Sequence, residues 1–534
     1  MRRPFRRSNP SPLRSLLLAA LAALVALAAG AALASETAPI ALEDPDDLLG
    51  DTFATGFRTL EDLTLEYEER EYFVSGEATV YTYAQPPVRG EKIPLSEDVP
   101  YKTRMIVRRP VDPAQFNGTV VIEWWNSTAG FDSAPSWDAS AEYFGRVGIV
   151  YVGVTNSTTS MNFLKTGCVL FGFPIANCLT RYASLDMPEN GQAFEIVSQI
   201  ANALKNGGNT PLPPEFEIER IFHVGQSQQG GSVITYANEF HSDVNDGYFV
   251  QAAGTARPIN FQPDCATAGA PAYPACTPRL TGAQSLVRRD LPVPVYRAQT
   301  ETDMAGVLAG NRRQEDSGDF RYYEMAGTAH TVIYKDVTVP VLNVPLESFC
   351  RFPMNATGDG PVFGSYLYNA MWNNMEKHVR NGTSPPHGSL IVEFGGVIAR
   401  DQFGNAMGGI RLPMVDVPLA TYGPNNTFNP TLPPVLHQIA DLQCRLSGTT
   451  TAFSQATLNA LYPTHASYYD PVVRSVNRLV AARFLLPPDA AKIKAEAALY
   501  QVACGLGVEL VALLPPLMWL QRFRQRRRLT SRTA

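Results

Sequence analysis

Short apolar runs alternate with segments of helical periodicity through the middle of the chain. Strands of a parallel sheet are buried on both faces, so they appear in a sequence as continuous apolar runs. The pattern therefore predicts βαβ units and an α/β fold, with a mostly parallel central sheet and helices on both of its faces. The predicted strands are Thr119–Trp125, Ile149–Val154, Ile218–Val224, Gly247–Ala253, Val293–Ala298 and Phe320–Met325. The predicted helices among them are Trp137–Arg146, Gly191–Lys205 and Gln229–Glu239.

Two further regions flank this series. Before it, Glu71–Val74 and Ala78–Tyr83 alternate between apolar and polar residues, which predicts an antiparallel start to the sheet. After it, Tyr366–Arg380 predicts an amphipathic helix that packs on the sheet. No linker divides residues 35–490, so we expect a single domain in which residues 340–487 form an elaboration, as a lid or a pocket wall.

The first 34 residues have the pattern of an export signal. Five arginines stand before or at the edge of an apolar run, Leu16–Leu33, and Ala32–Ala34 supplies the small residues of a cleavage site. Residues 1–34 are therefore predicted to be a signal peptide, which places the protein in the periplasm or outside the cell. The apolar run is also close to the length that spans a bilayer, so an uncleaved anchor is the alternative.

The C-terminal end, residues 491–534, combines an apolar helix with a basic tail. Residues 497–520 are long enough to cross a membrane, and six arginines follow them. Gln501, Glu509 and the prolines 515 and 516 are costly in hydrocarbon. Two interpretations stay open, a membrane anchor or a helix that packs on the domain.

The cysteines fit an exported protein. Closure of two short loops leaves the remaining two body cysteines to pair with each other, as expected in an oxidising compartment. The preferred pairs are Cys168–Cys178, Cys265–Cys276 and Cys350–Cys444, while Cys504 lies in the apolar tail. No group of Cys and His residues has the spacing of zinc ligands, so we expect no metal site.

Charge excludes one class of partner. The whole chain has 44 Lys and Arg against 50 Asp and Glu, a formal net charge of -6. Eleven of the arginines lie in residues 1–34 and 521–534, which contain no acidic residue, so the body between them has 33 basic and 50 acidic residues and a formal charge of -17. A nucleic-acid-binding protein would show a basic excess or a basic stripe, so we expect no nucleic-acid partner.

A serine stands between a predicted strand and a predicted helix. The strand Ile218–Val224 leads into Gly-Gln-Ser-Gln-Gln-Gly-Gly at residues 225–231, and a helix follows. A nucleophilic serine occupies such a sharp elbow, where a glycine two residues earlier relieves crowding. A glycine is also expected two residues after Ser227, where this chain has Gln229. The alternative is a serine that only caps the helix.

An imidazole base and a carboxylate follow the serine in the required order. Asp303 and Glu301 lie just beyond the strand Val293–Ala298, and His330 lies just beyond Phe320–Met325. A base needs a carboxylate that holds its tautomer, and we prefer Asp303 over Glu301 for this role. His223 lies inside an apolar run and is interpreted as a core residue. The other histidines have no evident carboxylate partner; they are His241, His378, His387, His437 and His465.

Two backbone N–H groups are expected to stabilise an oxyanion. The N–H of Gln228 stands at the start of the helix after Ser227, where helical N–H groups have no intrahelical acceptor. The second donor is expected from the loop after Thr119–Trp125, at Asn126 or Ser127. The alternative for this loop is an ordinary turn between a strand and a helix.

From about Leu60 to Ala490 the chain resembles a known family, the alpha/beta hydrolase domain proteins of bacteria, which are often exported. The shared motifs are EYFVSGEATVYTY, VVIEWWNSTAG, GIVYVGVT, GQSQQGG, QTETD, YYEMAGTAH and RDQFGNAMGGIRLPMVDVPLATY. The resemblance implies the α/β-hydrolase fold and serine hydrolase activity, with Ser227 as nucleophile and His330 as base. The family commonly has Ser-Gln-Ser-Gly at the elbow, so Gln229 is a departure.

The leading hypothesis is an exported serine hydrolase that cleaves small carboxylic esters without a cofactor. Its alternatives are an amide or peptide hydrolase that uses the same triad, and a non-catalytic binding or surface protein on a hydrolase fold. The first alternative shares every predicted site residue with esterolysis. The second is motivated by the altered elbow and by possible membrane attachment through the C-terminal segment.

Overall fold

The computed structural model describes most of the body of the chain. The described residues are 36–45, 52–53, 55–56, 58–63, 66–83, 89–167, 178–260, 280–305, 313–331, 338–339, 344–354 and 363–500. The predicted signal peptide, the tail from residue 501 and the cysteines at 168, 265, 276 and 504 therefore lie outside the described residues.

A nine-stranded sheet organises the described part of the chain, with the strand order β1-β2-β3-β5-β4-β6-β7-β8-β9. Strands β1, β2, β3 and β5 pair antiparallel, and all pairs from β5 through β4 to β9 are parallel. The strands are β1 (Ala41–Glu43), β2 (Tyr67–Tyr83), β3 (Lys92–Pro110), β4 (Thr119–Trp124), β5 (Val150–Val154), β6 (Arg220–Gln226), β7 (Gly247–Gln251), β8 (Val295–Thr300) and β9 (Phe320–Met325). The six predicted strands and the α/β class are confirmed. The predicted antiparallel start is also confirmed, although both predicted segments lie in one long strand, β2, which pairs with β1 and β3.

Helices cover both faces of this sheet. Val120 and Ile122 of β4 belong to one hydrophobic cluster, together with side chains of α6 and α7, whereas Val121 belongs to a second cluster with α3 and α9. Burial on both faces explains why β4 is apolar at successive positions. The main helices are α3 (Pro135–Val147), α6 (Ala193–Asn206), α7 (Gln228–Glu239) and α9 (Phe363–Asn381); the short ones are α2 (Leu60–Leu63), α4 (Thr158–Asn162), α5 (Cys178–Arg181) and α8 (Glu301–Met304).

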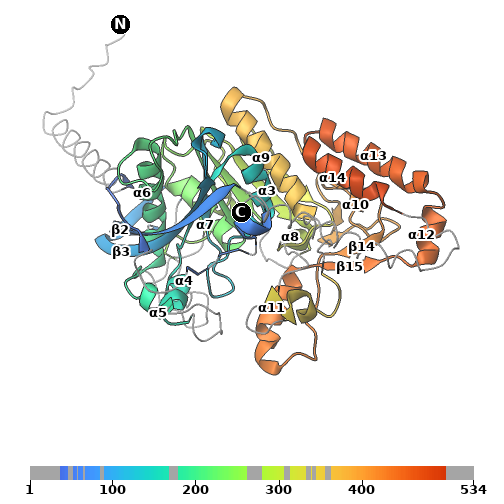
Figure 1. The fold of residues 1–534 in the computed structure, drawn as a ribbon, viewed down its shortest axis with the longest axis horizontal. Coiled ribbons are helices and arrows are strands. Elements are labelled where there is room, and N and C mark those ends of the chain that lie inside the picture. Colours follow the sequence, from blue (N-terminus) through green and yellow to red (C-terminus); the bar gives the residue numbers. More distant parts are fainter. Residues whose placement is uncertain are drawn as a thin grey trace, which may run out of the picture.

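The elements after α9 lie together on one side of the molecule, opposite α5 and α6 (Figure 1). They are β12 (Glu393–Phe394), β13 (Val397–Ile398), α10 (Pro413–Asp416), β14 (Ala420–Gly423), α11 (His437–Leu446), β15 (Thr449–Ala452), α12 (Gln455–Leu461), α13 (His465–Ala481) and α14 (Pro487–Ala498); β10 (Thr338–Val339) and β11 (Val344–Pro345) precede α9. Apolar side chains of α13 and α14 pack in the same cluster as β4, α3 and α9. This region therefore shares its core with the sheet.

The domain boundary expected at residue 490 falls inside a helix. α14 continues to Ala498, with Ala490, Ile493 and Ala497 buried. Arg146 of α3 also bonds Asp489 at 2.8 Å. The first turns of the segment expected to form a separate apolar tail are thus packed on the body. Within the described part of the chain, none of the helices combines the length and the apolar character that a membrane span needs.

One predicted disulfide lies within the described residues. Cys350 and Cys444 are joined, with 5.4 Å between their Cα atoms, so this pairing is confirmed. The bond connects the segment before α9 to α11 and is buried in a small apolar cluster with Phe349 and Met354.

Candidate active site

Ser227 occupies a sharp turn between β6 and α7. Its backbone has φ 58° and ψ -121°, a left-handed conformation that non-glycine residues rarely adopt. The turn is held by a hydrogen bond from Ser227 N–H to Gln251 O, at 2.9 Å, and by the Gly231 N–H bond back to Ser227 O. The side chain of Ser227 is only partly buried. The strand, turn and helix therefore present this hydroxyl at the carboxyl edge of the sheet, where α/β proteins carry their reactive groups.

The elbow requires glycine at two positions. A Cβ atom on Gly225 would lie 2.4 Å from Gln229 O, and one on Gly230 would lie 2.6 Å from the Cβ of Ala253. Position 229, where the family pattern has glycine, instead accepts a glutamine. The buried Gln229 side chain donates to Asn156 Oδ1 at 2.7 Å. The close approach of α7 to β7 therefore falls on Gly230, which explains why the glycines come one residue later than expected.

Asp303 and His330 form a buried pair. His330 Nδ1 lies 2.6 Å from Asp303 Oδ1. The other carboxylate oxygen, Oδ2, accepts the N–H of Thr300 at 2.7 Å and its hydroxyl at 2.8 Å, in a reciprocal cap at the start of α8. The cap fixes the carboxylate, and the carboxylate fixes the imidazole ring.

Glu301 faces away from His330. One of its oxygens accepts the N–H of Gly327, at 2.7 Å, and the other bonds Arg400. Burial raises the pKa of the Glu301 carboxyl, and Arg400 opposes that effect. Of the two carboxylates considered from the sequence, the structure brings Asp303 to the imidazole and places Glu301 on Arg400. The sequence carries no signal for the part taken by Arg400, which lies 99 residues further along the chain.

Two other histidines also pair with carboxylates, contrary to expectation. His387 Nδ1 lies 2.6 Å from Asp316, and His378 Nε2 lies 3.1 Å from Asp319. Their partners lie 71 and 59 residues away in sequence, so the pairs could not be anticipated. His387 is largely exposed, unlike His330. His223 is buried as predicted: it bonds Asn245 at 2.7 Å, and burial lowers its pKa to about 4.

The described residues Ser227 and His330 form no hydrogen bond between Oγ and Nε2 in this structure. Nucleophile–base contacts are often longer in the free enzyme and shorten when substrate binds. The two residues nevertheless belong to adjoining loops, because the side chain of Gln226 donates to His330 O at 2.9 Å.

The loop after β4 distinguishes between the two expected oxyanion donors. The Asn126 N–H already donates to Ser133 O at 2.9 Å, so it is not free to bind an oxyanion. Among the described residues no acceptor lies opposite the N–H of Ser127, which leaves Ser127 as the candidate. Gln228 is the first residue of α7, and its side chain donates to Ser127 Oγ at 2.7 Å. The two residues whose N–H groups are the candidate donors are therefore in direct contact through their side chains.

Glu123 connects the strand before this loop to the helix after it. It is buried in β4 and accepts the N–H groups of Ser136 and Trp137 at the start of α3, at 2.8 and 3.0 Å, and the hydroxyl of Tyr151 at 2.8 Å. Burial raises the pKa of this carboxyl to about 7. The same side chain thus ties the two ends of the loop that carries Ser127.

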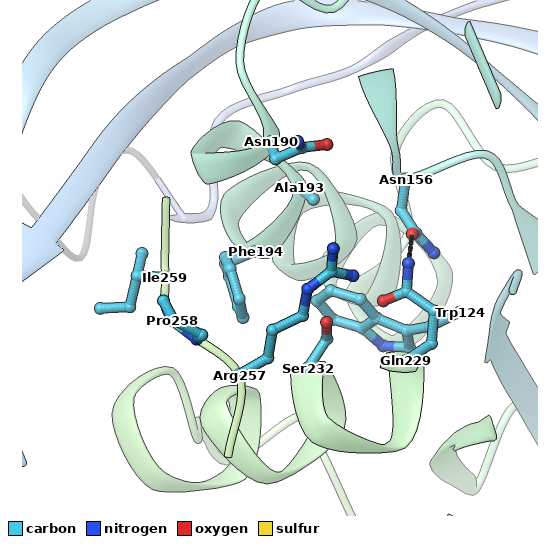
Figure 2. Close-up of a pocket in the computed structure, with 10 residues that line it drawn as sticks. All are labelled: Trp124, Asn156, Asn190, Ala193, Phe194, Gln229, Ser232, Arg257, Pro258 and Ile259. Carbon is cyan, nitrogen blue, oxygen red and sulfur yellow. Dashed lines mark hydrogen bonds between the residues drawn. The ribbon is translucent and has the colours of Figure 1, made fainter. Parts of the chain in front are cut away.

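A small cavity adjoins the first turns of α7. Its volume is about 20 Å³, which is room for one water molecule. Figure 2 shows Trp124, Phe194 and Arg257 around this space, with the Gln229–Asn156 bond at its edge. The remaining lining residues are Asn190, Ala193, Ser232, Pro258 and Ile259. No His, Cys, Asp or Glu side chain lines this cavity. Within the described residues, no group of three or more such side chains is arranged to hold a metal ion.

Comparison with known proteins identifies the family. The sequence model of the alpha/beta hydrolase domain matches residues 22–495. No curated protein matches the chain. Solved structures with a similar fold include an alpha-beta serine hydrolase homologue from Coxiella burnetii (10% identity, TM-score 0.25, 43% of this chain and 85% of that one). A second is the esterase Pf2001 of Pyrococcus furiosus (11% identity, TM-score 0.20, 39% of this chain and 56% of that one). A third is the G231F mutant of the rice cell wall degrading esterase LipA of Xanthomonas oryzae (10% identity, TM-score 0.21, 39% of this chain and 49% of that one).

The match of the family model covers most of the chain, including the elbow at Ser227 and the residues that follow β8 and β9. The chain belongs to the alpha/beta hydrolase domain family.

Proposed function

We propose that the protein is an exported serine hydrolase that cleaves small carboxylic esters. The observation that carries the proposal is the buried Asp303–His330 pair, 2.6 Å between carboxylate and imidazole, on the loop that Gln226 ties to the elbow of Ser227. A serine, a carboxylate and an imidazole that follow β6, β8 and β9 at the carboxyl edge of one sheet are the groups that acyl transfer needs. The chemistry requires no cofactor.

The proposed reaction assigns a role to each residue of the site. Ser227 Oγ attacks the ester carbonyl while His330 Nε2 takes its proton, and Asp303 stabilises the imidazolium through Nδ1–H. The N–H groups of Gln228 and Ser127 bind the oxyanion that forms. His330 then returns the proton to the leaving alcohol, which leaves an acyl group on Ser227. Water, activated by the same imidazole, releases the carboxylic acid and restores the enzyme.

Export is part of the proposal. The N-terminal signal pattern supports it, and so does the Cys350–Cys444 disulfide, because disulfides form and persist in oxidising compartments. Sequencing the N-terminus of the mature protein tests the cleavage expected after residue 34. Alkaline carbonate extraction of a membrane fraction tests attachment through residues 497–520.

The central test replaces Ser227 with Ala in the full chain. With p-nitrophenyl butyrate we expect kcat to fall by about 10⁴-fold or more, because no other hydroxyl takes the same place at the elbow. We expect a comparable fall of kcat in His330→Gln. His387→Gln is the matched control, since it removes an exposed imidazole that has the same 2.6 Å carboxylate contact. Full activity of Ser227→Ala would refute the assignment.

Two further measurements separate the alternatives. A fluorophosphonate probe should label the wild type and fail to label Ser227→Ala; absence of labelling in folded wild-type protein would favour a non-catalytic binding protein. Matched p-nitrophenyl esters and p-nitroanilides of the same acyl group then separate esterolysis from amide hydrolysis. We expect the ester to be the better substrate by orders of magnitude.

A further inference from the structure

One buried side chain connects three of the loops at the candidate site. Gln226 is the last residue of β6 and directly precedes Ser227. Its Nε2 donates to the main-chain oxygen of His330 at 2.9 Å, and its Oε1 accepts Asn126 Nδ2 at 3.0 Å. His330 and Asn126 lie 104 and 100 residues away in sequence. Three segments are therefore bonded to one amide: the elbow at Ser227, the loop after β9 that carries His330 (the histidine loop) and the loop between β4 and α3 that carries Ser127 (the oxyanion loop).

Asn126 carries the connection into the oxyanion loop. Its Nδ2 also donates to the main-chain oxygen of Gln226 at 3.0 Å, and its Oδ1 accepts the N–H of Thr128 at 2.8 Å. Its own N–H and C=O pair with Ser133 across the loop, both at 2.9 Å. Asn126 thus closes a turn around Ser127, the candidate oxyanion donor, while its side chain stays on Gln226.

The histidine is held from two directions. Asp303 orients the ring through Nδ1, whereas Gln226 holds the backbone of the same residue. The carboxylate contact fixes the angle of the ring, but it connects His330 to α8 and not to the strand that precedes Ser227. Among the described residues, Gln226 is the one residue of β6 that bonds His330 directly, so this contact fixes the position of His330 relative to the strand that carries the nucleophile.

We infer that Gln226, assisted by Asn126, is the positioning residue that sets the distance between His330 and Ser227 and the placement of the Ser127 N–H. The inference rests on the proposed function. Proton transfer and oxyanion binding tolerate little displacement, and a misplacement of about 1 Å can cost about 100-fold in rate. An amide suits this place because it donates to one loop and accepts from another at the same time.

Three variants interrupt this contact. Gln226→Met keeps the length of the side chain and removes both arms. Gln226→Glu can still accept from Asn126 but, when ionised, cannot donate to His330 O. Asn126→Asp keeps the acceptor for Thr128 and loses the donor to Gln226. Gln199→Met is the control, because Gln199 is a buried amide of α6 whose Nε2 donates to Glu77 O at 2.8 Å, away from the elbow.

We expect kcat on p-nitrophenyl butyrate to fall about 10- to 100-fold in Gln226→Met and Gln226→Glu, with KM within about 3-fold of wild type. In the same two variants we expect a shift of the apparent pKa on the ascending limb of the profile of kcat/KM against pH. Gln199→Met should lower the melting temperature while kcat stays within about 2-fold. Folded Gln226 variants with wild-type kcat and an unchanged pH profile would overturn the inference.

A spectroscopic measurement keeps this test independent of activity. The Nδ1 proton of His330, hydrogen-bonded to Asp303, should give a low-field proton resonance in the wild type that disappears in His330→Gln. We expect Gln226→Met to shift or broaden that resonance and Gln199→Met to leave it unchanged. A wild type that cleaves no ester but shows this pattern would refute the proposed function and retain the positioning role. An unshifted resonance in Gln226→Met would refute the positioning role alone.

Discussion

Asp303 divides its carboxylate between His330, at 2.6 Å through Oδ1, and the cap of its own helix through Oδ2. Glu301, two residues earlier on the same short helix, makes neither contact and bonds Arg400. Two residues of helix turn through about 200°, so side chains at these positions point in nearly opposite directions. The division of roles between the two acids follows from this geometry.

Replacement of Asp303 by Asn should therefore be far more damaging to catalysis than replacement of Glu301 by Gln. We expect kcat of Asp303→Asn to fall by about 10⁴-fold, because the amide favours the wrong imidazole tautomer and cannot stabilise imidazolium. Glu301→Gln should lower kcat by less than about 10-fold. Steady-state kinetics of the two folded variants decide the matter, and equal losses would contradict the assignment of the acid.

The Glu301–Arg400 pair should matter for stability. Burial raises the pKa of Glu301, so the folded protein binds this proton more tightly than the unfolded chain. The contribution of such a group is present below its unfolded pKa and is lost as the pH rises through its folded pKa. Arg400→Gln leaves the ionised carboxylate without its partner, and we expect a loss of about 1–3 kcal/mol at pH 8 and less at pH 5.

Urea unfolding at the two pH values measures this effect. Arg445→Gln is the control, since Arg445 forms an exposed pair with Asp441 one helical turn away, and such pairs contribute little. An Arg400→Gln variant whose stability loss is the same at pH 5 and pH 8 would show that Glu301 does not titrate as the structure indicates.

The disulfide should stabilise the fold and support the histidine loop. Leu446, two residues after Cys444, accepts both the N–H and the hydroxyl of Thr331, at 3.1 and 3.2 Å, and Thr331 directly follows His330. The bond closes a sequence separation of 94 residues. We expect the double variant Cys350→Ser, Cys444→Ser to lose about 2–4 kcal/mol of unfolding free energy and part of its kcat.

Chemical denaturation and kinetics below the melting transition measure the two effects separately. Thr331→Val is the companion variant, since it removes the hydroxyl contact and keeps the disulfide. Unchanged stability in the double serine variant would mean that the bond does not constrain the unfolded chain.

Glu123 should make stability depend on pH near neutrality. Burial raises its pKa to about 7, so its stabilising contribution is complete at low pH and is lost as the pH rises through about 7. The size of the effect is on the order of 3 kcal/mol. Glu123→Gln has no such titration, so we expect the slope of unfolding free energy against pH between pH 5 and pH 8 to become shallower. An unchanged slope in this variant would contradict the raised pKa.

Local patterns in the sequence were enough for the fold and for the order of the reactive groups. Strands buried on both faces, such as β4 and β6, are apolar at successive positions, so their runs are visible without any knowledge of their neighbours. The same holds for the elbow, because a strand, a glycine, a serine and a helix are consecutive in the chain. Ser227, Asp303, Glu301 and His330 could therefore be placed at strand ends from the sequence.

Tertiary structure decided which of these groups meet. Arg400 lies about a hundred residues from Glu301, and the partners of the Gln226 side chain lie equally far from it. The Asn126 N–H is excluded as an oxyanion donor by its bond to Ser133 across the loop. The carboxylate partners of His378 and His387 were hidden in the same way. Periodicity reports which face of an element is buried, whereas a hydrogen bond between distant loops depends on how whole elements are placed in space. For that reason the sequence determined the fold and the candidate groups, and only the folded chain determined their contacts.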